Sequence, residues 1–350
     1  MLHKAPWLAQ SRLAIFLQKQ LLALIALNQR YPWVVALYGF LSGVASFVMV
    51  DRQARLASLV AILMLASWLL LVLENAFNQH LARWFGIELP SWLARFVTQM
   101  IHQQSLFFVL PFFAMSTTWN SGQLVFTCLL GAAALISIID PLYYDWLAPR
   151  RWLYLAYHSL TLFAVQLTAM PIILHQTTAQ SYQLALLSTV LLAFPSLVAS
   201  LQLRRHWRWL AVPLLTAALL LAGWLARPWI PPATLRLNEV AISLALNDQA
   251  RVPGQSLQQL SSADLHRQGL FAFTAISAPR GLAERIYHVW RRNGVEVDRI
   301  ALDIQGGSND GYRAWSHKQN FPQQADGKWT VEVVTDAGQM IGVLRFVVSP

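Results

Sequence analysis

Charged residues and cysteine are both scarce in this sequence. Only 12% of the 350 residues are Asp, Glu, Lys or Arg, whereas 56% are hydrophobic. The mean hydropathy of +0.43 predicts a membrane protein and argues against a soluble enzyme of this length. Cys128 is the only cysteine, so no disulfide can form within the chain, and redox chemistry is not expected.

Acidic residues are especially few in the first two thirds of the chain. Before residue 229 there are 14 Lys and Arg against 5 Asp and Glu, and from there on 12 against 11. The basic excess therefore lies in the apolar part, as expected for loops that face an anionic membrane leaflet. A nucleic-acid-binding protein would carry a basic stripe on its soluble part. The lipid bilayer is therefore an expected partner, and nucleic acid is not.

Seven apolar stretches are long enough to span a bilayer as helices. A further stretch, 13–27, is interrupted by polar residues and is interpreted as a cytoplasmic interfacial helix within residues 1–31. The predicted fold class is therefore an α-helical transmembrane bundle of about seven helices over residues 32–228. The seven stretches are 32–50, 56–74, 102–119, 123–140, 153–174, 182–201 and 209–226.

Basic residues decide the predicted orientation. With a cytoplasmic N-terminus, eleven Lys and Arg of the helical half lie inside and three lie outside, and the opposite orientation reverses this bias. Seven spans then place the C-terminal part across the membrane, which in a bacterium is the periplasm. The expected location is the bacterial inner membrane. If 13–27 also spans, the C-terminal part is cytoplasmic instead.

The chain changes character after the apolar part. A proline-rich linker at 229–235 leads into residues 236–350, where charges of both signs are frequent. Apolar and smaller or polar residues alternate there, which is typical of strands, and Asn293-Gly294 indicates a tight hairpin. Together these signals predict a small all-β, immunoglobulin-like sandwich domain in the periplasm. The alternating series are Val240, Ile242, Leu244 and Leu246; Ile300, Leu302 and Ile304; and Trp329, Val331 and Val333.

A series of aromatic and basic residues recurs along this β-rich part. It consists of Ile286-Tyr287-His288-Val289-Trp290, Arg313-Ala314-Trp315-Ser316-His317-Lys318, Gly327-Lys328-Trp329-Thr330-Val331 and Gly338. Over roughly Leu270 to Val348 the series resembles a C-terminal domain of unknown function that is found in bacterial envelope proteins. With its helical region, the whole chain resembles an uncharacterised proteobacterial multi-pass inner-membrane family. The resemblance implies a β-rich terminal domain and an inner-membrane setting, but no chemistry.

Several side chains of the β-rich part form a candidate binding site. Tryptophan faces stack on sugar rings or lipid head groups, and basic side chains attract phosphate or carboxylate. In a second interpretation the tryptophans fill the sandwich core and the histidine bonds a neighbouring loop. A third makes Ser316 the nucleophile of a Ser/His/Lys site, although no nucleophile elbow surrounds it. The candidate binding residues are His288, Trp290, Arg313, Trp315 and Lys318.

Four ionisable residues of the apolar part form a candidate metal site. The predicted topology places Glu74, His102, Asp140 and His158 at the same cytoplasmic level. Two imidazoles and two carboxylates suit zinc, iron or manganese, and ionisable groups at membrane depth are costly unless they pair, face water or bind an ion. The alternative is that they are hydrated helix-end residues, with Asp140-Pro141 ending a helix.

Two functions therefore follow from the sequence. The first is a cell-envelope binding or scaffolding component that acts through its periplasmic β-domain on a glycan, a lipid or another membrane protein. It has no catalytic residues and no cofactor. The alternative is a membrane-embedded enzyme or lipid transporter that uses the polar cluster, with a transition metal as its cofactor.

Overall fold

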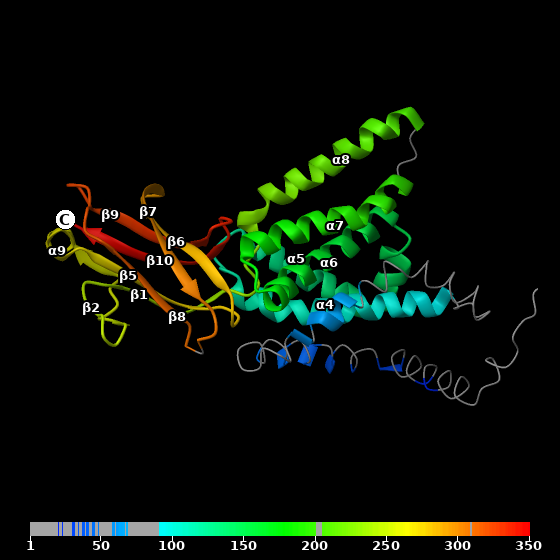
Figure 1. Ribbon diagram of the computed structural model, residues 1–350, viewed down its shortest axis with the longest axis horizontal. Helices are drawn as coiled ribbons and strands as arrows, with labels where there is room; N and C mark the ends of the chain where they lie inside the picture. The colour runs from blue at the N-terminus through cyan, green and yellow to red at the C-terminus, as the bar shows by residue number, and fades with distance from the viewer. Residues whose placement is uncertain are drawn as a thin grey trace, which may run out of the picture.

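The structure, a computed structural model, describes residues 91–200, 205–308 and 310–350, together with scattered positions between residues 20 and 68. A helical part and a β-domain lie end to end (Figure 1). Most of the predicted interfacial helix at 13–27 and much of the first two predicted spans lie outside the described residues.

The helices of the described part run back and forth past one another, joined by short loops (Figure 1). Apolar residues at helical spacing form their core: Leu106, Val109 and Phe113 on the first of these helices have no exposed surface. Pro141 begins a π-helix, where its missing N–H is not needed. The helices are α4 (Ser91–Ser116), α5 (Gln123–Ile138), the π-helix (Pro141–Leu147), α6 (Arg151–Leu174), α7 (Thr178–Ser200), α8 (Arg205–Leu225) and a 3-10 helix (Arg227–Trp229).

The structure corrects the predicted fold class. Among the described helices, α6 alone is long and apolar enough to cross a membrane. A second candidate arises only if α5 and the π-helix after it, which are bent by 100°, form one broken span. The prediction of a transmembrane bundle of about seven helices is therefore wrong. Apolar runs also arise where helices pack on one another, and 67% of the apolar window of α6 is buried in this way.

The predicted β-rich C-terminal domain is confirmed. Three strands form one sheet in the order β1-β5-β8, and five form another in the order β4-β10-β9-β6-β7. Asn293 and Gly294, both with positive φ, form the predicted hairpin between β6 and β7. The elements are β1 (Arg236–Ser243), β2 (Leu246–Asn247), β3 (Val252–Pro253), β4 (Gln259–Ser261), α9 (Ser262–Gln268), β5 (Leu270–Ser277), β6 (Ala283–Arg292), β7 (Val295–Gln305), β8 (Tyr312–Lys318), β9 (Gly327–Thr335) and β10 (Met340–Ser349).

The inner faces of the two sheets share one hydrophobic core. Ile276 of β5 belongs to the smaller sheet, and Ile286, Trp290 and Val331 belong to the larger one. All four side chains are fully buried. The alternation that predicts these strands is therefore the alternation between the core and the outer surface of the domain.

Three buried polar side chains join the helical part to the β-domain. Gln123 Nε2 donates to the carbonyl of Met340 at 2.8 Å, and Gln339 Nε2 donates to the carbonyl of Ile230 at 2.9 Å. Glu284 of β6 accepts from the backbone N–H of Thr178 at 2.7 Å and from its hydroxyl at 3.0 Å. These contacts fix the β-domain against the loops at one end of the helices.

The carboxyl group of Glu284 lies inside this junction, with a relative exposure of 3%. Burial raises its pKa to about 7, although the hydrogen bonds from Thr178 oppose the shift. One pKa unit corresponds to about 1.4 kcal/mol, so the shift from 4.5 to about 7 makes ionisation about 3 kcal/mol less favourable in the fold than in the unfolded chain.

We expect Glu284 to make the stability of the protein fall as the pH rises. The raised pKa means that the folded chain binds the proton more tightly, so the stabilisation is complete below about pH 4.5 and is lost as the pH passes about 7. Glu284→Gln keeps acceptor and donor atoms for Thr178 and should remove this dependence. Thermal unfolding of the full chain in mild detergent across this pH range measures it.

The matched control is Glu239→Gln on β1, whose side chain is exposed. It should follow the wild type at every pH. If Glu284→Gln also followed the wild type, burial of Glu284 would not control the stability of the junction.

Candidate functional site

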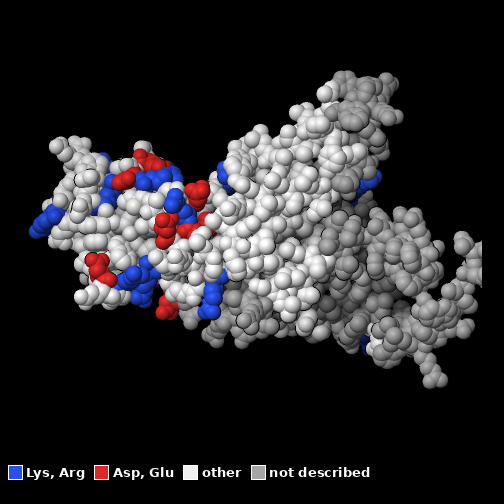
Figure 2. All heavy atoms as spheres, in the orientation of Figure 1, with Lys and Arg blue, Asp and Glu red and all other residues white. Residues whose placement is uncertain are grey.

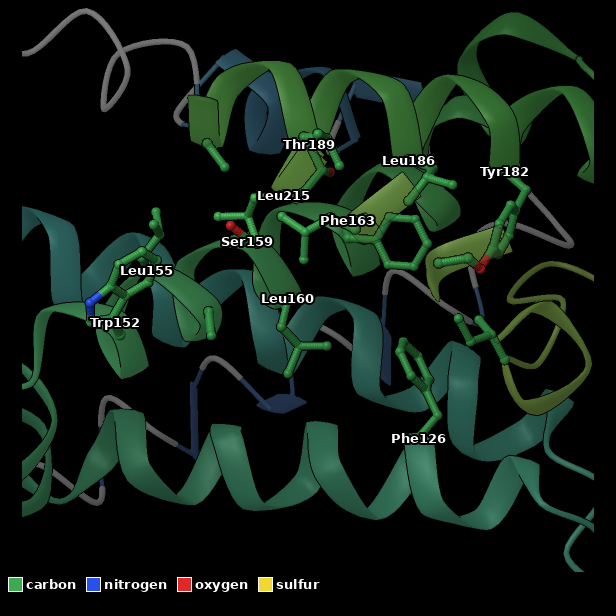
Figure 3. Close-up of a pocket in the computed structure, with 16 residues that line it drawn as sticks. Phe126, Trp152, Leu155, Ser159, Leu160, Phe163, Tyr182, Leu186, Thr189 and Leu215 are labelled. Atoms are coloured by element: carbon green, nitrogen blue, oxygen red, sulfur yellow. The ribbon is translucent and has the colours of Figure 1, made fainter. Parts of the chain in front are cut away.

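A pocket of about 520 Å³ opens between α6, α7 and α8 (Figure 3). Its volume lies within the range of small-molecule and cofactor sites, roughly 300–1,000 Å³. Its walls are almost entirely apolar. The lining residues are Phe126, Trp152, Leu155, Ala156, Ser159, Leu160, Phe163, Tyr182, Leu186, Thr189, Val190, Ala193, Leu215, Leu219, Gly223 and Ile230.

The pocket exists because α8 meets α7 at one end and diverges from it toward the other (Figure 1). At the end near the β-domain, the hydroxyl of Tyr182 donates to the carbonyl of Gly223 at 2.5 Å. Glycine at this position lets α8 come close to the side chain of Leu186. Toward its N-terminal end α8 diverges from α7. Side chains of both helices line the pocket there, together with side chains of α6.

Besides Tyr182, two residues with hydroxyl groups interrupt the apolar walls of this pocket. Thr189 on α7 has a relative exposure of 7%, and its Oγ1 has no hydrogen-bond partner among the described residues. Ser159 on α6 is half-buried and makes no side-chain hydrogen bond within the part of the chain that the structure describes. No charged side chain is present among the described lining residues. An apolar pocket with a few polar groups is the usual form of a small-molecule site.

A separate polar network lies between α4, the π-helix and α6. His102 Nδ1 bonds the hydroxyl of Tyr143 at 2.7 Å, and His102 Nε2 bonds Nδ1 of His158 at 3.0 Å. The hydroxyls of Tyr143 and Tyr154 are 3.4 Å apart. A cavity of about 490 Å³ adjoins this network and is lined by Arg95, Tyr143, Tyr144, Ala148, Pro149 and Tyr154.

The structure brings only part of the predicted metal site together. His102 and His158 are in contact, whereas Asp140 accepts from Gln99 Nε2 at 2.7 Å, and Glu74 lies outside the described residues. Both ring nitrogens of His102 are engaged by its neighbours, which leaves neither for a metal. Within the described ranges, no three His, Cys, Asp or Glu side chains are grouped so that they could hold a metal ion.

The predicted binding residues of the β-domain do not form one surface. His288 and Trp290 are fully buried in the sandwich core. Lys318 is also buried, and its Nζ lies 2.7 Å from the carboxylate of Asp298, whose pKa the contact lowers. Arg313 donates to backbone carbonyls of the β2–β3 loop, and Trp315 packs on Phe273 of the smaller sheet.

Hydrogen bonds satisfy the buried His288 completely. Its Nδ1 bonds the hydroxyl of Ser316 at 2.9 Å, and its Nε2 bonds the hydroxyl of Thr274 at 3.2 Å. Ser316 accepts from the indole N–H of Trp290, and Thr274 donates to the carbonyl of Ala314. The chain of bonds is complete with a neutral imidazole that carries its proton on Nε2. Burial agrees with this state, because it lowers the pKa of His288 to about 3.

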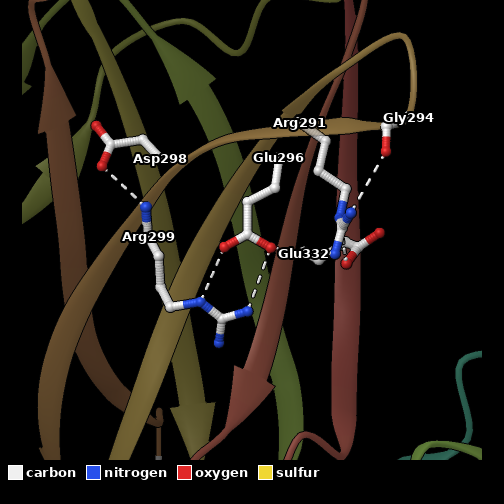
Figure 4. Close-up of polar contacts among 6 residues, drawn as sticks. All are labelled: Arg291, Gly294, Glu296, Asp298, Arg299 and Glu332. Atoms are coloured by element: carbon white, nitrogen blue, oxygen red, sulfur yellow. Dashed lines mark hydrogen bonds and ion pairs between the residues drawn. The ribbon is translucent and has the colours of Figure 1, made fainter.

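The charged residues on the outside of the larger sheet neutralise one another (Figure 4). Arg291 pairs with Glu332 at 2.9 Å, and Arg299 pairs with Glu296 at 3.0 Å. Exposed pairs of this kind contribute little to stability. Because both signs alternate, this face offers no concentrated charge to an anionic partner.

Residues 14–272 match the model of a family of unknown function (DUF5924), which covers more than half of the chain. The chain belongs to DUF5924. A second family model, for a protein of unknown function (DUF2914), matches residues 283–348. The prediction of an uncharacterised family with a C-terminal domain of unknown function is therefore confirmed, whereas the proteobacterial source stays a prediction. No curated protein and no solved structure matches the chain.

The pocket of this DUF5924 chain was not among the sites predicted from the sequence. Ser159 and Thr189 are 30 positions apart and stand in ordinary helical stretches. Only the packing of α6 against α7 brings them to one cavity.

We expect Ser316→Ala to destabilise the β-domain by about 1–3 kcal/mol. The substitution leaves the indole N–H of Trp290 and Nδ1 of His288 without their partner inside the core. Denaturant unfolding of the full chain, followed by near-ultraviolet circular dichroism, measures the change. Ser256→Ala, at an exposed loop position, is the control and should change stability by less than about 0.5 kcal/mol. Equal stability of the two variants would contradict the network.

Proposed function

We propose that this chain is a lipid-binding protein of the bacterial inner membrane, with a pocket between α6, α7 and α8 that holds an acyl chain. The pocket itself carries the proposal: it encloses about 520 Å³, its walls are apolar, and no charged residue is found among its described lining residues. Water gains almost no hydrogen bonds on such walls, whereas a hydrocarbon chain is removed from water by binding there.

The apolar surface around the pocket supports the proposal that the helices contact lipid. Large apolar side chains of α7 and α8 are exposed, among them Leu191 at 67% and Leu214 at 73%. Figure 2 shows red and blue side chains gathered over the β-domain, whereas the described surface of the helices is largely white. Exposed apolar area of this extent indicates contact with a membrane or a partner. In the proposal α6, which meets the length and hydropathy of a span, crosses the bilayer.

The basic residues of the helices support a periplasmic β-domain. Arg150 and Arg151 lie at the beginning of α6, which is the end of this helix that is remote from the β-domain. Near the β-domain, the described helical part contributes only Arg227. Because cytoplasmic loops are rich in Lys and Arg, the remote end is assigned to the cytoplasm.

The β-domain is proposed to lie in water and to hold one end of the binding site in place. Ile230 lines the pocket, and its carbonyl accepts from Gln339 in the turn between β9 and β10. The pocket therefore ends at the junction with the β-domain. A scaffolding role of this domain in the envelope is compatible with its neutral, paired charges.

A second candidate function uses the polar network of the helices. The cavity beside Tyr143 gives a ligand access to a chain of hydroxyl and imidazole groups that ends at His158. Such chains can transfer protons, because each group both donates and accepts. Under this alternative the helical part is a membrane-embedded enzyme or lipid transporter.

We expect Ala193→Trp to reduce the lipid that co-purifies with the protein at least tenfold, because the indole fills the pocket beside Thr189. Native mass spectrometry of the full chain in mild detergent measures the retained lipid. Leu191→Trp places the same indole on the exposed side of α7 and is the matched control. Equal lipid on both variants would refute the pocket as the binding site, and a loss of lipid on His102→Phe alone would favour the polar network.

The orientation is tested with single cysteines in a Cys128→Ala background. Ser256→Cys, in an exposed loop of the β-domain, should react with a membrane-impermeant thiol reagent in intact cells. Asp145→Cys, exposed in the π-helix at the opposite end, should react only after lysis. The reverse pattern would place the β-domain in the cytoplasm.

A further inference from the structure

The polar groups of the pocket narrow the class of its ligand. Of the three hydroxyl-bearing residues among the described lining residues, Tyr182 already donates to Gly223. Ser159 and Thr189 have no partner within the part of the chain that the structure describes. A buried hydroxyl without a hydrogen bond is unfavourable, so a ligand that offers Thr189 an acceptor is favoured in this pocket.

Both hydroxyls belong to the same pocket. Figure 3 shows Ser159 on α6 and Thr189 on α7 projecting from the two walls toward its interior. Thr189 is one or two helical turns from Tyr182 and Leu186, which continue the α7 wall toward the β-domain. Ser159 is similarly one or two turns from Trp152 and Leu155, which continue the α6 wall toward the cytoplasmic end. Apolar walls therefore extend on both sides of the hydroxyls.

The described lining residues also favour an uncharged ligand. They contain no Lys, Arg or His, so a carboxylate in the pocket would lack a cation. An ionised group without a partner in an apolar site is strongly disfavoured. A free fatty acid is thus a poor ligand, and a pure hydrocarbon would leave both hydroxyls unpaired.

We infer that the pocket selects a neutral acyl ester, whose carbonyl oxygen accepts a hydrogen bond from Thr189 while its apolar parts extend along the walls on either side. This inference rests on the proposed lipid-binding function and names the class of lipid.

The test compares two uncharged probes of similar length, methyl palmitate and octadecane. The full chain in mild detergent is titrated with each probe, and native mass spectrometry gives the bound fraction. Thr189→Val keeps the shape of the side chain and removes the hydroxyl. We expect it to weaken methyl palmitate binding about tenfold and to leave octadecane binding unchanged.

The matched control is Thr216→Val on α8, because the hydroxyl of Thr216 already donates to the carbonyl of Val212 and does not line the pocket. It should bind both probes as the wild type does. The Tm of ligand-free Thr189→Val should equal or exceed that of the wild type, because the variant loses an unpaired buried hydroxyl. A raised or equal Tm together with weaker ester binding separates recognition from a folding defect.

The remaining outcomes would overturn the inference or the proposed function. If Thr189→Val binds both probes as the wild type does, or loses both equally, the ester assignment is overturned while the pocket remains a lipid site. If palmitate binds the wild type more tightly than methyl palmitate, the assignment to a neutral ligand is overturned. If the wild type binds neither uncharged probe, the proposed function fails together with this inference.

Discussion

The contact between Tyr182 and Gly223 determines the arrangement of the helical part. It holds the end of α8 against the beginning of α7, and the missing side chain of Gly223 makes room for Leu186. From this contact α8 runs away from α7, and the apolar pocket lies between the two helices and α6. The same contact positions the chain that follows α8, so the place where Ile230 meets the β-domain depends on it as well.

Two buried histidines, one in each part of the molecule, find partners for both ring nitrogens within the fold. His102 uses both ring nitrogens between Tyr143 and His158, and His288 uses both between Ser316 and Thr274. Histidines satisfied in this way are structural, since neither nitrogen is left for a metal or a ligand. Other buried polar atoms, such as Ser181 Oγ and Thr234 Oγ1, have no partner either among the described residues, and what sets the hydroxyl of Thr189 apart is that Thr189 lines the pocket.

The sequence predicts local structure well where one periodicity decides it. Alternation and the Asn293-Gly294 turn predict the strands of the β-domain, and alternation also puts His288 and Trp290 on the same face of β6. It does not say which face is the core, because that depends on the second sheet. The candidate surface site therefore includes residues that lie inside the sandwich.

The number of spans was not predictable for a related reason. An apolar run has the same composition whether its side chains meet lipid or other helices, and Leu106, Val109 and Phe113 are buried by packing. The bend after α5 also depends on how the π-helix is placed, which Asp140-Pro141 signals only as a helix end. The pocket was even harder to predict from the sequence. Ser159 and Thr189 line the same cavity only because α6 and α7 pack antiparallel to each other.

The junction with the β-domain makes the two halves of the molecule one functional unit. Ile230 forms part of the pocket wall and at the same time binds Gln339, while Glu284 binds the first residue of α7, the helix that carries Tyr182, Leu186 and Thr189. A ligand that displaces Ile230 or shifts α7 must therefore change contacts of the β-domain. Because these contacts are buried hydrogen bonds and not exposed ion pairs, they respond to displacements of a fraction of an ångström. Ile230 is thus part of the pocket wall and of the junction with the β-domain at the same time.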